Sequence, residues 1–167
     1  LNYMDSTVAR LPQLENRLGL TGLGMVPHSS KKLLDEIFRS PTLGSRIPNF
    51  LLECFRVIRS NIILHPGREG KSQVIAITSA RPGEGKSTMA ANLAWSFFSM
   101  GERTLLIDAD LRRGRTHEIL DLPNVKGLSS HFAGEVTFED AIQKTVNPNL
   151  DVVTRGPFLP GASEYLA

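Results

Sequence analysis

Apolar residues recur along the chain with two different spacings, one helical and one typical of buried strands. Between Asn49 and Leu64 they return every three or four residues, and at about 100° per residue they form one narrow stripe. This stripe predicts an amphipathic helix that His65-Pro66-Gly67 ends. The members of the stripe are Leu51, Phe55, Ile58 and Ile62.

Short β-branched runs indicate strands that are apolar on both faces, as in a parallel sheet. Residues 74–78 (VIAIT) and 104–107 (TLLI) have this character. An Ala-rich helix from about Lys86 to Met100 is expected between them. Strand, helix and strand then form a βαβ unit, whose crossover is right-handed.

The rest of the chain divides into a punctuated N-terminal part and a region of weaker elements. Up to Ile47, closely spaced Pro and Gly residues predict a connecting segment with one helix over 29–38. Toward the C-terminus we expect two weaker helices and a third strand, over residues 114–120, 138–146 and 150–153. The predicted fold class is α/β, with a linker over 1–47 and one domain over 48–167.

The composition fits one globular domain and argues against several other classes of protein. A chain of 167 residues buries enough surface to fold without disulfides, and its single cysteine, Cys54, could form none within the chain. The net charge of +2 and the 7% of aromatic residues argue against nucleic acid as a partner. Neither a leader nor an apolar run near the ~20 residues that cross a bilayer is visible, so we expect a cytosolic domain.

The strongest chemical signal is a glycine-rich loop between the first expected strand and the Ala-rich helix. The phosphates of a nucleotide require converging backbone N–H groups, and Gly83 and Gly85 allow a close approach because they lack a β-carbon. Lys86 is expected to reach the β- and γ-phosphates, and the Ser87 hydroxyl to bind Mg²⁺. Ala80 occupies the first-glycine position of the pattern G-x-x-x-x-G-K-[ST]. The predicted ATP-binding residues are Ala80, Gly83, Glu84, Gly85, Lys86, Ser87 and Thr88.

Two carboxylates follow the second expected strand, at the sheet edge that the glycine-rich loop also occupies. Asp108 and Asp110 can hold Mg²⁺ or its waters, and we assign Asp108 as the base that accepts a hydroxyl proton. For each carboxylate, capping of the next helix is the alternative interpretation. Lys86 and Arg112 are further candidate catalytic residues. The basic run that begins with Arg112 has three alternative interpretations: a contact with phosphate, a contact with a neighbouring subunit, or a solvated turn.

These motifs resemble the bacterial tyrosine autokinases of capsule and exopolysaccharide synthesis. The resemblance rests on the glycine-rich loop, on Asp108-x-Asp110-x-Arg112, and on an upstream E-x-x-R-x-x-R helix. It extends to Gly127-Leu128-Ser129 and to the segment that begins with Gly156-Pro157. It implies a P-loop NTPase-like parallel sheet flanked by helices and incomplete at the C-terminus, with residues 48–167 as the N-terminal part of a kinase domain.

The resemblance also implies partners and a location. In this family the helix that carries Glu53, Arg56 and Arg59 packs kinase domains into a ring, although a solvated pair of Glu53 and Arg56 is the simpler alternative. Leu23-Gly24-Met25-Val26-Pro27 resembles the junction with a transmembrane chain-length-determinant module, on the same chain or on another. The implied substrate is the tyrosine-rich tail of a neighbouring subunit, at the cytoplasmic face of the bacterial inner membrane.

Three features depart from the pattern of that family. A further hydrophobic strand that ends in Asp and a tyrosine-rich tail are not in the sequence, whose tyrosines are Tyr3 and Tyr165, and Gly161-Ala162-Ser163 replaces an Asn-Pro. We therefore expect little phosphoryl transfer from this chain alone. Two other functions stay open. One is a positioning ATPase of the septum-site or chromosome-partitioning kind, which Arg81 in place of Lys argues against, and the other is a non-catalytic regulator switched by ATP.

Overall fold

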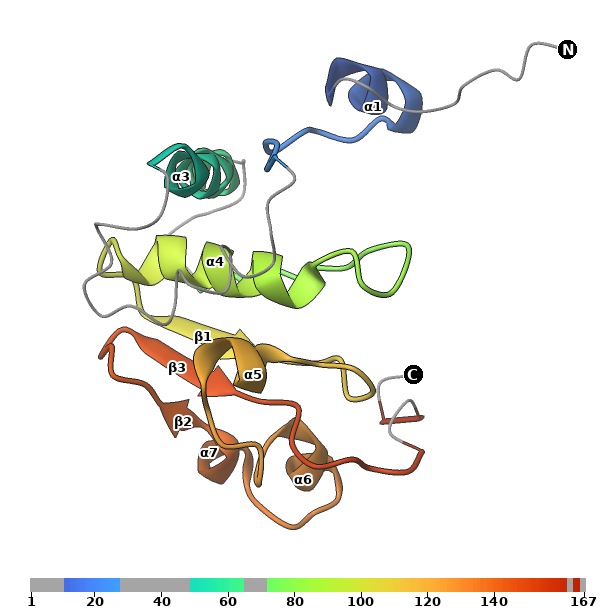
Figure 1. The fold of residues 1–167 in the computed structure, drawn as a ribbon, viewed down its shortest axis with the longest axis vertical. Helices are drawn as coiled ribbons and strands as arrows, with labels where there is room; N and C mark the ends of the chain where they lie inside the picture. The colour runs from blue at the N-terminus through green and yellow to red at the C-terminus, as the bar shows by residue number, and fades with distance from the viewer. Residues whose placement is uncertain (1–10, 28–48, 65–71, 162–163, 166–167) are drawn as a thin grey trace, which may run out of the picture.

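The computed structural model describes residues 11–27, 49–64, 72–161 and 164–165, which form helices stacked on a small sheet (Figure 1). The helices are α1 (Leu11–Leu18), α3 (Asn49–Leu64), α4 (Lys86–Phe98), α5 (Thr116–Leu120), α6 (Leu128–Phe132) and α7 (Phe138–Ala141). The strands are β1 (Thr104–Ile107), β2 (Gln143–Lys144) and β3 (Leu150–Val153).

The sheet has the order β1-β3-β2. β1 and β3 are parallel, with Thr104 opposite Leu150 and Ile107 opposite Val153. β2 is antiparallel to β3, so the sheet is mixed and not purely parallel as expected. Because β1 and β3 run in the same direction, the residues that follow both strands emerge at one edge of the sheet.

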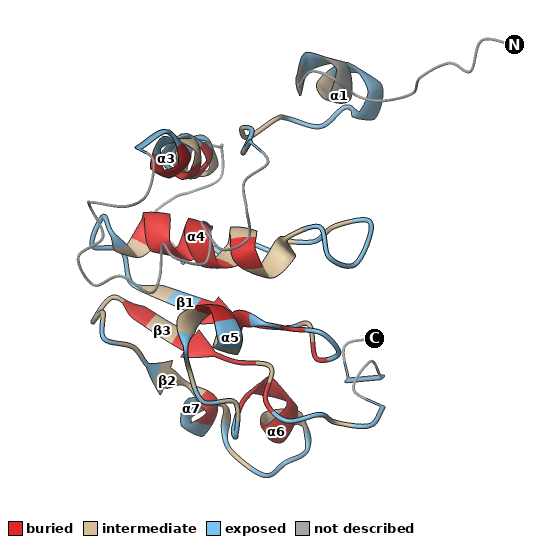
Figure 2. Cartoon of the chain, in the orientation of Figure 1, coloured by how far each residue is buried: buried red, intermediate tan, exposed pale blue. Residues whose placement is uncertain are grey.

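Helices cover both faces of this sheet (Figures 1 and 2). The apolar cluster between α4, α5 and the sheet comprises Ala91, Ala94, Leu106, Ile119, Leu150 and Val152. The cluster on the opposite face, beneath α6 and α7, comprises Leu111, Leu128, Ala141 and Val153. Burial of these side chains is the main driving force that fixes α4 against β1 and β3.

The structure confirms the two long helices that the sequence predicts. α3 has the expected bounds, and α4 ends at Phe98, two residues before the expected end at Met100. Leu51 and Phe55 of the apolar stripe are fully buried, and Ile58 packs with Leu93 and Phe97 of α4. Figure 2 shows the buried side of α3 turned toward α4.

A part of the expected linker packs against this helix pair. Leu23 and Val26 join the apolar cluster of Ile58. Asn61 Nδ2 donates a hydrogen bond to Leu23 O at 2.8 Å. A β-carbon on Gly24 would lie 2.7 Å from Ile58 Cγ1, so the backbone of this segment approaches α3 closely.

The predicted strand over 74–78 is wrong in this structure. Residues 72–79 belong to no strand, and Val74 is 98% exposed. β1 has its expected bounds but is buried on one face only, since Leu105 and Ile107 are each more than 40% exposed. A strand needs a hydrogen-bonded neighbour, and no described residue pairs with 74–78 or with the outer edge of β1.

The weaker elements differ from expectation in their bounds. The helix predicted over 114–120 is α5, which begins two residues later, and the helix predicted over 138–146 ends with α7 at Ala141. The extended backbone of Ile142 and the pairing of β2 with β3 end it, because ladder bonds replace helical ones. β3 is confirmed, whereas α1 and α6 were not predicted. The helix expected over 29–38 and residues 65–67, which were expected to end α3, lie outside the described residues.

Among the described helices, none combines the length and the apolar character that a membrane-crossing helix requires.

Candidate phosphate-binding site

The glycine-rich loop, residues 79–85, leads directly into α4 (Figure 1). Gly83 and Gly85 have φ angles of +84° and +92°, in the left-handed region that other residues avoid. A β-carbon at either glycine would meet nothing within 4 Å, so the backbone conformation itself requires both of them. Gly85 is the N-cap of α4, and its turn sets the direction of the first helical amides.

Two hydrogen bonds within the loop hold its shape. Ser79 Oγ donates to Arg81 O at 2.9 Å, and the Arg81 N–H donates to Glu84 Oε2 at 3.0 Å. Glu84, predicted among the ATP-binding residues, therefore shapes the loop through its carboxylate. The N–H groups in the first turn of α4 have no acceptor within the helix, and the helix dipole adds positive charge there. Amides in this position are able to bind an anion.

The predicted side chains at the start of α4 differ in exposure. Lys86 and Ser87 are half-buried, and Ala80 is exposed at the beginning of the loop. Thr88 is 8% exposed, and its carbonyl accepts a hydrogen bond from Asn92 Nδ2 at 2.7 Å. Lys86 and Ser87 are thus accessible to a ligand, whereas Thr88 belongs to the packed part of the helix.

Asp108 directly follows β1 and is only 5% exposed. Its N–H donates to Val153 O at 2.9 Å, which continues the ladder between β1 and β3. Its carboxylate accepts the N–H of Asp110 at 3.2 Å and the N–H of Thr116 at 2.9 Å. Thr116 is the first residue of α5, so the helix-capping interpretation of Asp108 describes a contact that the structure contains.

The loop that follows Asp108 is wrapped tightly around this carboxylate. A β-carbon on Gly114 would lie 2.6 Å from Asp108 Cγ, so a residue with a side chain does not fit there. Asp110 is half-buried, its carbonyl accepts the Gly114 N–H at 2.7 Å, and its Oδ1 accepts the Arg113 N–H at 2.9 Å. Both predicted carboxylates therefore help to shape the loop in addition to being candidate metal ligands.

Arg155, which sequence reasoning missed, connects this loop to the neighbouring strand. Its Nε donates to Gly114 O at 3.0 Å. Asn124 holds the next residue, because its amide both donates to Gly156 O at 2.8 Å and accepts the Gly156 N–H at 3.0 Å. The available signal was position, since Arg155 lies two residues after buried β3, at the sheet edge where Asp108 follows β1.

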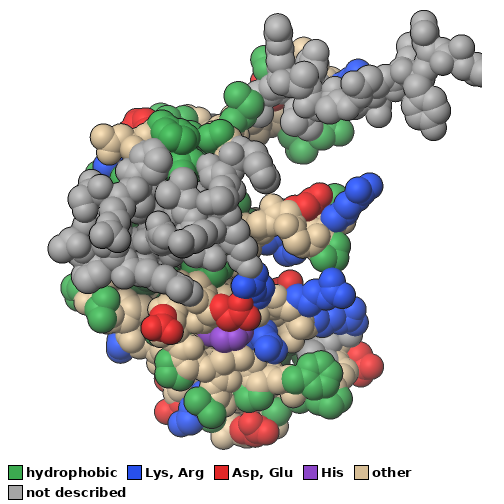
Figure 3. Space-filling view, viewed as in Figure 1, with side chains coloured by type: hydrophobic (Ala, Val, Ile, Leu, Met, Phe, Trp, Pro, Cys, Tyr) green, Lys and Arg blue, Asp and Glu red, His purple; other side chains and the backbone are tan. Residues whose placement is uncertain are grey.

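Basic side chains gather near this end of the molecule (Figure 3). Arg112 and Arg113 are exposed, and Arg115 Nε donates to Glu118 Oε2 at 2.6 Å. The hydrogen bond from Arg115 lowers the pKa of Glu118 below its usual range, against the opposing effect of desolvation. Arg115 therefore pairs with Glu118, and Arg112 and Arg113 are exposed residues of the loop before α5.

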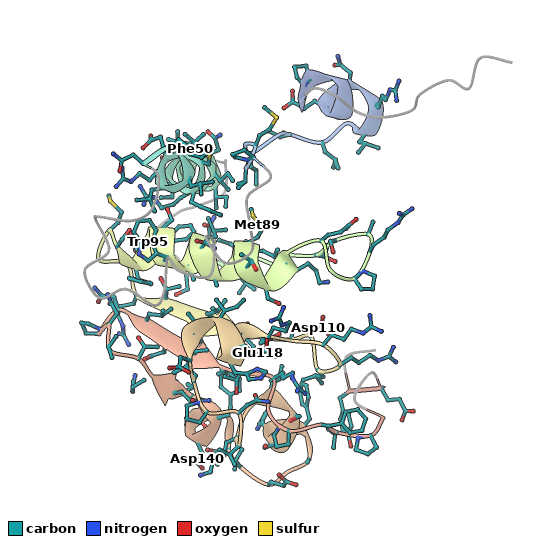
Figure 4. The ribbon with its side chains drawn as sticks, in the orientation of Figure 1. Phe50, Met89, Trp95, Asp110, Glu118 and Asp140 are labelled. Atoms are coloured by element: carbon teal, nitrogen blue, oxygen red, sulfur yellow. The ribbon has the colours of Figure 1, made fainter. Side chains whose placement is uncertain are left out.

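The structure brings the two predicted chemical motifs to one end of the fold. The glycine-rich loop and the loop after β1, in which Asp110 is labelled, lie at the same end of the layers (Figures 1 and 4). The E-x-x-R-x-x-R helix lies apart from both, on the outer side of α4. There Arg56 Nη1 pairs with Glu53 Oε2 at 3.3 Å on the exposed face of α3, while Arg59 is buried.

The donor set fits a magnesium ion that is shared with a nucleotide. Among the described residues no group of three or more His, Cys, Asp or Glu side chains forms a metal cage. Mg²⁺ in phosphate-transfer sites typically takes one or two carboxylates, waters and the phosphates themselves, so such a cage is not required. The oxygen atoms of Asp108, Asp110 and Ser87 are of the hard type that this kind of site uses.

Known proteins with similar sequences or structures point to one group. Residues 72–166 match the family described as "AAA domain". A putative tyrosine-protein kinase CapB of Staphylococcus aureus is 42% identical over 115 residues, which cover 69% of this chain and 50% of that protein. Tyrosine-protein kinase YwqD of Bacillus subtilis is 46% identical over 116 residues, 69% of this chain and 48% of that protein. The chain thus matches about half the length of these relatives.

Solved structures agree with the sequence comparison. The chimerical protein CapA2B2 superposes with a TM-score of 0.74 at 40% identity, covering 95% of this chain and 65% of that one. The kinase domain of the Escherichia coli tyrosine kinase ETK superposes with a TM-score of 0.75 at 29% identity, with the same coverage. The chain therefore belongs to the AAA-domain family of P-loop proteins, and within that family it resembles the bacterial tyrosine kinases.

Proposed function

We propose that the protein to which this chain belongs is an ATP-dependent protein-tyrosine kinase. It phosphorylates other copies of the same protein and regulates capsule or exopolysaccharide synthesis. The observation that carries this proposal is that a left-handed glycine turn at the start of α4 and a buried carboxylate after β1 lie at the same end of the fold, in a chain similar to named tyrosine kinases. Each half alone fits any nucleotide-binding protein. The combination with that similarity favours phosphoryl transfer to tyrosine.

The first turn of α4 is assigned to the triphosphate. Its free amides and the Lys86 ammonium bind the phosphates, and Gly83 and Gly85 hold the turn that directs the amides outward. The Ser87 hydroxyl, with Asp108 and Asp110, provides oxygen ligands for Mg²⁺. When bound, Mg²⁺ and ATP supply the transferable γ-phosphoryl group and offset its charge.

Asp108 is assigned to orient the tyrosine hydroxyl and accept its proton, the role of a general base. Its carboxylate already receives two backbone N–H groups, which fix its direction without using all of its lone pairs. Arg112 is assigned to the negative charge that the reaction spreads over the phosphate oxygens. Most of the catalysis then comes from positioning and charge complementarity.

The proposed partners follow the family pattern. Glu53 and Arg56, exposed on α3, are assigned to a contact between kinase subunits in a ring, and the substrate is a tyrosine in a neighbouring subunit's tail. A transmembrane chain-length-determinant module, on this chain or another, would hold the domain at the cytoplasmic face of the bacterial inner membrane.

The test uses the full-length protein and two lysine variants. Lys86→Met removes the ammonium at the glycine-rich loop and is expected to lower autophosphorylation on the order of 10²–10³-fold. Lys144→Met is the matched control, because Lys144 pairs with Asp151 at 2.7 Å on the antiparallel edge of the sheet. Phosphotyrosine after incubation with Mg²⁺ and ATP is the readout, and undiminished labelling of Lys86→Met would refute the assignment.

The same assay separates the alternatives. A positioning ATPase would release phosphate without forming phosphotyrosine, and an ATP-switched regulator would bind nucleotide and do neither. If the wild-type protein neither binds nucleotide nor forms phosphotyrosine, all three proposed functions are refuted.

A further inference from the structure

Arg59 occupies a different environment from its two neighbours in the E-x-x-R-x-x-R motif. The side chains of Glu53 and Arg56 are 61% and 52% exposed, whereas Arg59 is 8% exposed. At about 100° per residue, Arg59 lies roughly 120° from Glu53 around the helix and only about 40° from Phe55. It therefore belongs to the side of α3 that faces α4, beside the apolar stripe.

Hydrogen bonds tie Arg59 to the last turns of α4. Its Nη1 donates to Ser96 O and to Ser96 Oγ, the latter at 3.1 Å. Ser96 is fully buried, and its hydroxyl donates back to Phe55 O at 3.2 Å. The two residues thus link the helices in both directions.

The end of α4 supplies the counter-charge. The Met100 N–H, which would reach Ser96 O in a continued helix, bonds to Phe97 O at 3.0 Å and leaves Ser96 O to other donors. This carbonyl accepts the Ser99 hydroxyl at 3.1 Å and the Arg59 guanidinium. No described carboxylate forms an ion pair with Arg59. A positive side chain at the C-terminal carbonyls also meets the negative end of the helix dipole, which makes this burial of charge tolerable.

α3 in turn supports the glycine-rich loop from both sides. The apolar cluster of Ile58 includes Ile77, two residues before Ser79, and Met89, four residues after Gly85. Figure 4 shows Met89 on α4. A shift of α3 would therefore displace residues at both ends of the loop, because packed interiors transmit strain.

We infer that Arg59 is a positioning residue that acts within one chain: it fastens α3 to the end of α4 and thereby holds the support of the glycine-rich loop in place. On this helix the contact between subunits then falls to Glu53 and Arg56. The inference rests on the proposed function only where it treats the loop as the nucleotide site.

The experiment compares Arg59→Ala, Arg59→Lys and the matched control Arg56→Ala in the full-length protein. Hydrogen exchange of residues 49–64 and 93–99 is measured together with the sedimentation coefficient. Arg59→Ala is expected to accelerate exchange in both segments by about tenfold or more, because a buried charge-assisted bond is lost. Arg59→Lys should recover most of the protection, since an ammonium can still donate to Ser96 O. Arg56→Ala should alter the assembly and leave the exchange of residues 93–99, in and after α4, unchanged.

Nucleotide binding provides the second readout. The dissociation constant of a fluorescent ATP analogue is expected to rise by about threefold or more in Arg59→Ala, because binding weakens. In Arg59→Lys it should return toward the wild-type value. If Arg59→Ala does not fold, Ser96→Ala, which removes one acceptor, should give a smaller acceleration of exchange in the same two segments.

Two results would overturn the inference. One is an Arg59→Ala protein that loses its assembly while exchange in α3 and α4 stays at the wild-type rate. The other is wild-type exchange in Ser96→Ala when Arg59→Ala fails to fold. A wild-type protein that binds no nucleotide would refute the proposed function instead, and the exchange measurement would still decide the role of Arg59.

Discussion

Gly114 lies against the carboxylate of Asp108, so closely that a β-carbon on Gly114 would be 2.6 Å from Asp108 Cγ. The same loop gives this carboxylate the N–H groups of Asp110 and Thr116. The backbone therefore encloses Asp108 on several sides. The direction of the carboxylate therefore depends on backbone groups of its own loop.

Replacement of Gly114 tests this enclosure. Gly114→Ala is expected to destabilise the fold by about 1–3 kcal/mol, because the added methyl group overpacks the site and displaces the carboxylate. Urea unfolding measures the change. The cost should be smaller in an Asp108→Ala background, where the overlap is relieved, and equal costs in the two backgrounds would contradict the contact.

Arg155 is expected to hold the same loop from the neighbouring strand. Arg155→Ala removes the hydrogen bond from Nε to Gly114 O and should lower stability by about 1 kcal/mol. It should also reduce autophosphorylation of the full-length protein, because the loop that carries Asp108 and Asp110 is loosened. Arg103→Ala, at an exposed position before β1, is the control and should change neither quantity. Equal effects of the two variants would remove Arg155 from the site.

The contact between Gly24 and α3 can be separated from backbone strain. Gly19 and Gly24 both have positive φ angles, but a β-carbon meets Ile58 only at Gly24 and nothing within 4 Å at Gly19. Gly24→Ala should therefore lower the melting temperature more than Gly19→Ala does. Equal shifts in melting temperature would mean that residues 23–26 do not pack at a fixed position on α3.

The ion pair of Glu118 predicts a small dependence of stability on pH. Because Arg115 lowers the pKa of Glu118 in the folded state, the pair stabilises the fold above the ordinary glutamate pKa, about 4.3. This contribution is lost as the pH falls through the lowered value. It should stay below about 1 kcal/mol and weaken with salt, since both side chains are nearly half exposed.

Paired variants isolate this contribution. Glu118→Gln should be less stable than wild type at pH 7 and equal to it in strong acid. Glu135→Gln, at an exposed position after α6, should match wild type throughout. If the difference in stability between Glu118→Gln and wild type stays the same in strong acid, its cause is not the charge of Glu118.

The elements that the sequence predicted well are those whose signal is local. The stripe of α3 repeats over sixteen residues, and the start of α4 is marked by Gly85 and Lys86, so periodicity and glycine chemistry suffice. The strand over 74–78 failed for the opposite reason. Its β-branched composition is a real preference, but a strand exists only when another strand pairs with it.

The candidate site divides in the same way. The glycine-rich loop and Asp108 could be found from motif and order, because their chemistry needs particular residue types at fixed spacing. Arg155 could not, because its side chain acts through a hydrogen bond to the carbonyl of Gly114, 41 residues earlier in the sequence. Gly114 could not, because its role depends on how closely its backbone approaches the Asp108 side chain. The burial of Arg59 was also missed, since the motif groups it with two exposed charges.

The sequence by itself determined the helices α3 and α4, the glycine turn that joins loop to helix, and the carboxylates after β1, because each depends on neighbours within a few residues. Only the tertiary structure decided which of these charges are enclosed. It enclosed Asp108 in its own loop, which Arg155 holds from the neighbouring strand, and it placed Arg59 against the end of α4. The partners that complete each arrangement come from distant parts of the chain, since a buried charge must be satisfied by whatever the fold brings beside it.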